Sequence, residues 1–115
     1  MTTSILITFQ LEGIHNFPAA KKLFPNVGFL ADFHRHQFHF KLEKIVTHDD
    51  RDEEFIMFKR RVSEWLKSKF YSEEYNCLFF DSMSCEMIAR ELLITFNLKS
   101  AEVWEDLENG ARIER

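Results

Sequence analysis

The chain contains a stretch, HRHQFHFKL at residues 34–42, in which side chains of two kinds alternate without a break. Side chains two positions apart leave the same face of a β-strand, so this stretch has two faces of different character. One face is polar, and the other carries His34, His36, Phe38, Phe40 and Leu42. The alternation predicts a half-buried strand that runs from His34 to Thr47.

A second alternating segment, Ser4–Glu12, predicts another half-buried strand ahead of the first. Between the two strands, residues 13–33 have no clear period, and Gly13, Pro18 and further glycine and proline residues mark the segment as a long connection. Long connections in compact domains are uncommon and are usually functional when they are ordered. We therefore expect residues 13–33 to contribute to a site.

Two amphipathic helices are expected after the second strand. An acidic turn, His48–Glu54, precedes apolar residues at three-to-four spacing from Phe55 to Phe70. Ser84 can cap a second helix whose apolar stripe runs from Cys85 to Phe96. The link between the helices, Tyr71–Asp81, has no clear pattern, and we expect an irregular segment with room for one short strand.

The end of the chain predicts a β-hairpin. Ala101–Asp106 reads as a strand, Asn109-Gly110 is typical of a hairpin turn, and Ala111–Glu114 reads as a short final strand. The order of elements is then ββααββ, which predicts an α+β fold with two helices on one face of an antiparallel sheet. At 115 residues the chain is expected to form a single domain, residues 1–115.

Composition narrows the function classes. Hydrophobic residues make up 45% and charged residues 30%, as in globular proteins, and the net charge of −4 argues against a nucleic-acid partner. No apolar run is long enough to span a bilayer, and residues 1–8 lack the basic start of a signal peptide. We therefore expect a cytoplasmic protein with reduced cysteines and no membrane partner. The 13 phenylalanines are many for a monomer of this size and predict a homo-oligomer.

The histidines suggest a metal site. His34 and His36 leave the same face of their strand, roughly 7 Å apart, on a face that is otherwise apolar. Buried imidazoles need partners, and zinc prefers imidazole ligands. His15, just beyond the first strand, would be the third ligand if the two strands are neighbours. The alternative is that these histidines lie half-exposed at a rim or line an interface.

The remaining histidines have simpler explanations. His39 points to the polar face of its strand and is expected to be solvated. His48 lies beside Asp49 and Asp50, so these residues could form a second polar site. An acidic turn that caps a helix also accounts for the two aspartates.

Four short motifs, taken in order, resemble a known family. They are the segments ending at His15, His34–His36, Met83–Ala89 and Val103–Asp106. Together they are similar to the tunnelling-fold (T-fold) enzymes of the 6-pyruvoyltetrahydropterin and 6-carboxytetrahydropterin synthase type. The resemblance implies a T-fold whose sheets join into a barrel in an oligomer, with a ring-binding pocket between subunits.

The resemblance also implies roles for individual residues. His15, His34 and His36 would bind Zn²⁺. Glu105 would accept hydrogen bonds from the N–H groups of a pterin-like or purine-like ring, because a carboxylate offers two acceptors to such an edge. Two further residues, Ser84 and Cys85, would contact the ring.

Departures from the family concern the acid–base half of the site. The family's catalytic cysteine lies four residues before its His-x-His pair, where this chain has Leu30. Leucine has no ionisable group and cannot act as a nucleophile or a base. The family's Asp-His segment has no counterpart between Lys67 and Asp81, and Arg35 stands where the family has glycine.

Two functions remain open from the sequence. The first is a divergent zinc-dependent lyase of the pterin or deazapurine type that acts on a small molecule without the usual cysteine, with His48 or Asp49 as candidates to move protons. The second is a non-catalytic oligomer that sequesters or senses a nucleotide-like ligand in the same pocket.

Overall fold

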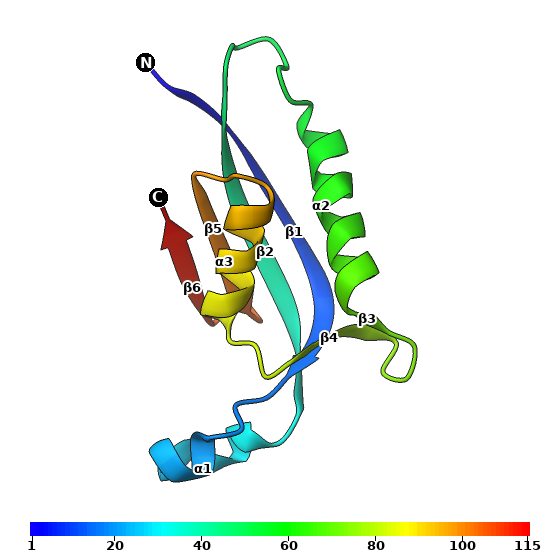
Figure 1. Ribbon diagram of the computed structural model, residues 1–115, viewed down its shortest axis with the longest axis vertical. Helices are drawn as coiled ribbons and strands as arrows, with labels where there is room; N and C mark the ends of the chain where they lie inside the picture. Colours follow the sequence, from blue (N-terminus) through cyan, green and yellow to red (C-terminus); the bar gives the residue numbers. More distant parts are fainter.

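The computed structural model describes residues 1–115 and shows one six-stranded sheet covered on one face by helices (Figure 1). The long elements follow the expected order, and four short ones join them. The strands are β1 (Thr3–His15), β2 (His34–Val46), β3 (Tyr71–Ser72), β4 (Cys77–Asp81), β5 (Ser100–Glu105) and β6 (Asn109–Glu114). The helices are α1 (Ala20–Leu23), the 3₁₀ segment η1 (Pro25–Ala31), α2 (Phe55–Phe70) and α3 (Cys85–Thr95).

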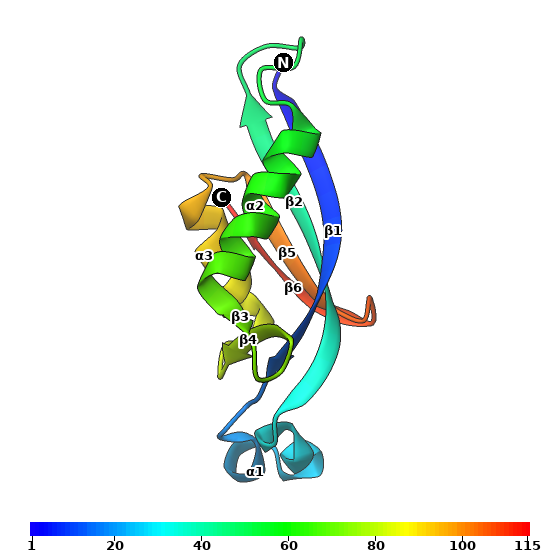
Figure 2. The same ribbon diagram turned by 90° about the vertical axis from the view of Figure 1, so that its right-hand side faces the viewer.

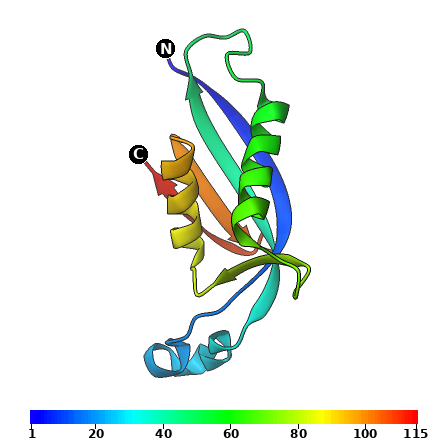
Figure 3. The same ribbon diagram turned by 45° about the vertical axis from the view of Figure 1, so that its right-hand side comes forward.

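The helices α2 and α3 lie side by side on the same face of the sheet (Figure 3), and the opposite face carries no helix (Figure 2). The α+β class and this arrangement of helices are therefore confirmed. No helix has both the length and the apolar character needed to cross a membrane.

The central pair of strands, β1 and β2, is antiparallel and runs without a shift from Thr3 opposite Val46 to His15 opposite His34. The alternation of residues 34–42 is confirmed, because Phe38, Phe40 and Leu42 are buried beneath the helices. They share one core with the inward-facing residues of both helices, among them Val62 and Leu92. The long in-register pair thus forms the floor of the core.

The prediction that the first strand ends at Gly13 is wrong. The strand β1 continues through Gly13 to His15, and the missing side chain at Gly13 is what allows the core to close there. A Cβ atom at this position would lie 2.9 Å from the rings of both Phe38 and Phe80. The glycine serves close packing, which the sequence alone does not distinguish from a turn.

The expectation of an all-antiparallel sheet is also wrong at one place. The order is β3-β4-β1-β2-β5-β6, and β1 pairs with β4 in parallel. The segment predicted as an irregular link forms the short β3–β4 pair instead, and β4 contributes the buried residues Leu78 and Phe80. The sheet is open, with β3 and β6 at its edges.

The last hairpin turns earlier than predicted. Asp106 and Leu107 both have positive φ, at 55° and 59°, while Asn109 pairs with Glu105 inside the β5–β6 ladder. Aspartate tolerates the left-handed region better than most residues. This turn positions the Asp106 side chain beside His36 and Gln37, at the start of β2.

The structure predicts that Gly13→Ala is destabilising. The added methyl group would force the rings of Phe38 and Phe80 to move, at a cost of about 1–3 kcal/mol. Urea unfolding measures the loss, with Thr8→Ala on the exposed side of β1 as the control. An unfolding midpoint equal to that of the wild type would contradict this packing.

Candidate metal centre and adjoining cleft

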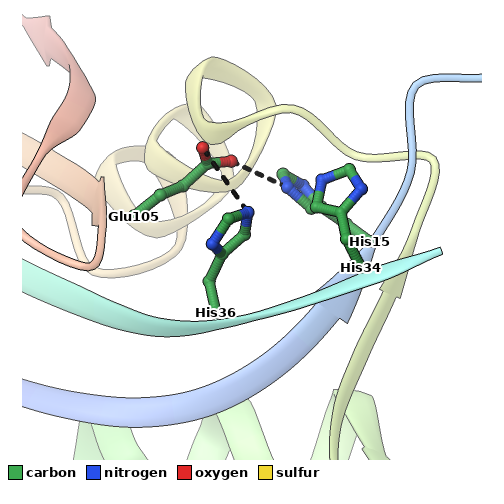
Figure 4. Close-up of side chains that lie close together, drawn as sticks. All are labelled: His15, His34, His36 and Glu105. Carbon is green, nitrogen blue, oxygen red and sulfur yellow. Dashed lines mark ion pairs between the residues drawn. The ribbon is translucent and has the colours of Figure 1, made fainter. Parts of the chain in front are cut away.

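Four side chains from three strands meet at one end of the sheet (Figure 4). They are His15 at the end of β1, His34 and His36 at the start of β2, and Glu105 at the end of β5. One ligand atom from each lies within 4.8 Å of all the others. The predicted convergence of the three histidines is therefore present, and Glu105 joins them.

Strand register produces this meeting. His15 lies directly opposite His34, and Gly13 lies opposite His36, so the imidazoles project from the core-facing side at the strand ends. The antiparallel pairing of β2 with β5 sets Glu105 opposite Phe38, on the same face. The cluster therefore continues the core face of the sheet beyond the last buried phenylalanine.

Each imidazole is held through its Nδ1 atom by a different oxygen. The Nδ1 of His15 lies 2.8 Å from the carbonyl of Met83, and that of His34 lies 2.9 Å from the carbonyl of Asp32. The Nδ1 of His36 lies 2.7 Å from the carboxylate of Asp106. A carbonyl or carboxylate can only accept, so each Nδ1 carries the proton and each Nε2 presents a lone pair.

The Nε2 atom of His15 is buried and has no hydrogen-bond partner. The Oε2 of Glu105 lies 2.7 Å away and forms an ion pair with His15 when that imidazole is protonated. The Oε1 of the same carboxylate lies 3.7 Å from the Nε2 of His36 (Figure 4). When His15 is unprotonated, its lone pair and those of the carboxylate face one another, an arrangement that either a proton or a metal cation would stabilise.

The charges of the cluster follow from burial and from these contacts. Burial acts to lower the pKa of His15, but Glu105 and the Met83 carbonyl raise it above its usual value. Burial lowers the pKa of His34, and the two neighbouring imidazoles lower it further. The interaction with His15 lowers the pKa of Glu105 in spite of its burial. Glu105 is therefore an anion at neutral pH.

A cleft of about 560 Å³ opens beside the cluster. Its wall includes the predicted ring-contacting residues Ser84, Cys85 and Glu105, together with His15 and His34. Residues 13–33 also contribute to the wall, as expected from their length. Leu30, at the position of the family's catalytic cysteine, is among them.

Cys85 does not replace that cysteine chemically. Its thiol is buried at the start of α3, and its Sγ lies 3.7 Å from the Glu105 carboxylate. Burial, together with the negative charge of Glu105, raises the pKa of Cys85 to about 12. A thiol with so high a pKa is a poor nucleophile at neutral pH.

The structure does not bring His48 and Asp49 to the cluster. They follow the other end of β2, a strand of 13 residues that begins at His34, and line a separate hollow with the N-terminus of the chain. His48 lies 3.7 Å from Asp52, and Asp49 accepts a hydrogen bond from Thr3. Within one chain, neither side chain can exchange a proton with a ligand held by the three histidines.

Sequence reasoning missed the groups that orient the histidines. Two of the three are backbone carbonyls, which no residue type reveals. Asp106 stands in the quoted motif next to Glu105, and only the position of the hairpin turn shows that it reaches His36. His39, by contrast, lies on the opposite face of the sheet, as expected from its parity.

Comparison with known proteins supports the fold only. The crystal structure of an uncharacterized protein from Wolinella succinogenes is similar over 100% of this chain and 99% of that chain. The TM-score is 0.67 and the sequence identity is 15%. No family model matches the chain. A comparison with curated proteins gives no match either.

Proposed function

We propose that this chain is a zinc protein that holds Zn²⁺ through His15, His34 and His36 and binds a pterin-like or purine-like small molecule in the adjoining cleft. The observation that carries the proposal is the orientation of the three imidazoles. Each has its Nδ1 bonded to an oxygen, and one ring nitrogen of each lies within 4.8 Å of those of the other two and of the Glu105 carboxylate. Histidines that bind metals in proteins are held in this way.

The donor set fits zinc. Zinc accepts imidazole nitrogen and carboxylate oxygen in a tetrahedral arrangement, and three protein ligands with one open position are typical of its catalytic sites. The Nε2 of His15 is buried and faces the Glu105 carboxylate at 2.7 Å, so a cation placed between them would have a nitrogen and an oxygen ligand. When bound, zinc would supply Lewis-acid polarisation of a hydroxyl or carbonyl group in the cleft.

The cleft suits a flat ring that carries hydrogen-bond donors along one edge. Glu105 and Cys85 line it, and Glu105 is charged, so its carboxylate can accept two hydrogen bonds from a ring edge. Ser84 is the N-cap of α3: its Oγ accepts a hydrogen bond from the backbone N–H of Met87. This contact places the Ser84 hydroxyl at the N-terminus of the helix. These positions agree with the T-fold roles that the resemblance implies.

We propose that the site converts its ligand chemically, as an enzyme does. The second candidate function is sequestration, in which the ligand is bound but not converted. The specific observation in favour of sequestration is that the groups expected to move protons are missing from the cleft or inactive in it. Leu30 replaces the family's cysteine, Cys85 is protonated, and His48 lies at the far end of β2. The retained set of three histidines favours the enzyme, since sequestration alone does not require a Lewis acid.

Both candidates include a homo-oligomer. The sheet has two open edges, and the segment between β1 and β2 exposes Phe24, Phe29 and Phe33. Unpaired edges and exposed aromatic rings are typical of subunit interfaces. Sedimentation of the protein as a monomer would contradict this part of the proposal.

Purified without chelators, the protein should contain about one zinc ion per chain, because the site has three imidazole ligands. His34→Ala and His36→Ala should each lose the ion, since two imidazoles remain. His39→Ala is the matched control: this histidine lies on the same strand but on the other face, and the variant should keep its zinc. Metal analysis of the four proteins tests the site, and a wild type without metal would refute it.

Asp106→Asn should weaken zinc binding by about 10- to 100-fold, because the charged oxygen that holds the Nδ1 of His36 is lost. Asparagine tolerates the positive φ of this position, so the turn should persist. Competition with a chromogenic chelator measures the affinity. Asp49→Asn, which alters an aspartate remote from the cluster, should bind zinc as the wild type does.

Incubation of the zinc-loaded protein with a dihydropterin triphosphate and with guanine nucleotides separates the two candidates. A chemically altered product that requires His34 would support the enzyme. Tight binding followed by recovery of the intact compound would support sequestration. If no pterin or purine compound binds at millimolar concentration, the ring-binding proposal fails for both.

A further inference from the structure

Glu105 lies at the boundary between the histidine cluster and the cleft. Its Oε2 is 2.7 Å from the Nε2 of His15, and its Oε1 is 3.7 Å from the Nε2 of His36. The ligand distances of a tetrahedral zinc site, about 2.0–2.1 Å, put neighbouring donor atoms roughly 3.3 Å apart. The two observed separations lie on either side of this value. A small shift of the carboxylate would therefore give it the spacing of a zinc ligand.

A hydrogen bond from the start of α3 holds this carboxylate beside the imidazoles. The buried thiol of Cys85 donates to the Oε2 of Glu105 over 3.7 Å. Carboxylates that bind metals are themselves hydrogen-bonded by neighbouring groups, as ligating imidazoles are through their second nitrogen. Glu105 is therefore oriented by the protein in the same manner as the three histidines.

Two roles of Glu105 compete for the same oxygen atoms. A ring edge with two donors requires both carboxylate oxygens to face the cleft, whereas a metal ligand presents at least one of them to the imidazole nitrogens. In the structure each oxygen lies near an imidazole nitrogen of the cluster, although Glu105 also belongs to the wall of the cleft. The observed orientation is the one that a fourth metal ligand needs.

We infer that Glu105 is the fourth ligand of the metal when the cleft is empty, and that a ring compound frees this coordination position by taking the carboxylate as its hydrogen-bond acceptor. The inference rests on the zinc site and the ring site proposed above and describes how they are coupled. Before a ring binds, Glu105 excludes water and small anions from the metal. Glu105 thereby reserves the metal for a compound that is already in the cleft.

The zinc affinity of Glu105→Gln tests the role as a ligand. The amide keeps the size of the side chain but is neutral and binds zinc poorly. Because the loss of even an outer partner of a metal ligand costs about 10- to 100-fold, the affinity should fall at least about tenfold. Glu102→Gln, on the same strand but on the opposite face, is the matched control and should bind zinc as the wild type does. Circular dichroism of the metal-free proteins shows whether both variants fold.

Azide binding to the cobalt-substituted protein separates a lost ligand from a lost charge, because the visible spectrum of Co²⁺ reports its ligands. Glu105→Gln should bind azide at least about tenfold more tightly than the wild type, since the fourth position is then open. Glu86→Gln removes a negative charge from the exposed wall of the same cleft and should change the azide affinity by less than about threefold. Equal azide affinity in Glu105→Gln and the wild type would overturn the inference.

Neopterin tests the coupling in the cobalt-substituted wild type. It should change the visible spectrum, because Glu105 leaves the metal as the ring binds. Calorimetric binding of neopterin with no spectral change would overturn the coupling, and both the metal site and the ring site would remain. A wild type that binds no metal, or that binds metal but no pterin-like or purine-like ring, would instead remove the proposed function and the inference with it.

Discussion

The pairing of β1 with β2 is the constraint on which the rest of this structure depends. Over thirteen residues the two strands keep one register, from Thr3 opposite Val46 to His15 opposite His34. A slip by one residue would turn His34 and His36 to the exposed face and bring Arg35 and Gln37 into the core. The same register that buries Phe38 and Phe40 therefore brings three imidazoles together at the strand ends.

Orientation of those imidazoles is supplied from elsewhere in the chain. The acceptors for the three Nδ1 atoms come from the segment before α3, the residue two positions ahead of β2, and the turn after β5. Two of these segments adjoin elements that are packed in the core: α3 buries Ile88 and Leu92, and β5 buries Ala101 and Val103. The geometry of the centre is thus tied to the core as a whole, as expected for a preorganised site.

Much of this was predictable from local patterns. Period-two alternation indicated both long strands, three-to-four spacing indicated both long helices, and the parity of His34 and His36 indicated a shared face. The sequence patterns gave wrong strand ends and turns where one residue type can serve two structural roles. Gly13 was predicted to turn the chain but instead admits the Phe38 ring, and Asn109-Gly110 pairs within a strand because the turn falls at Asp106. The carbonyl of Met83 and the parallel β1–β4 pair depend on distant contacts that no local pattern contains.

In the proposed centre, three imidazole nitrogens bind one zinc ion beside a carboxylate. X-ray absorption spectroscopy at the zinc edge tests it most directly, because the distances of nitrogen and sulfur ligands differ. We expect three imidazole nitrogens at about 2.0–2.1 Å with an oxygen as the remaining ligand, and no sulfur. A sulfur ligand at about 2.3 Å would place Cys85 in the coordination shell and contradict the three-histidine site, as would a spectrum without imidazole scattering.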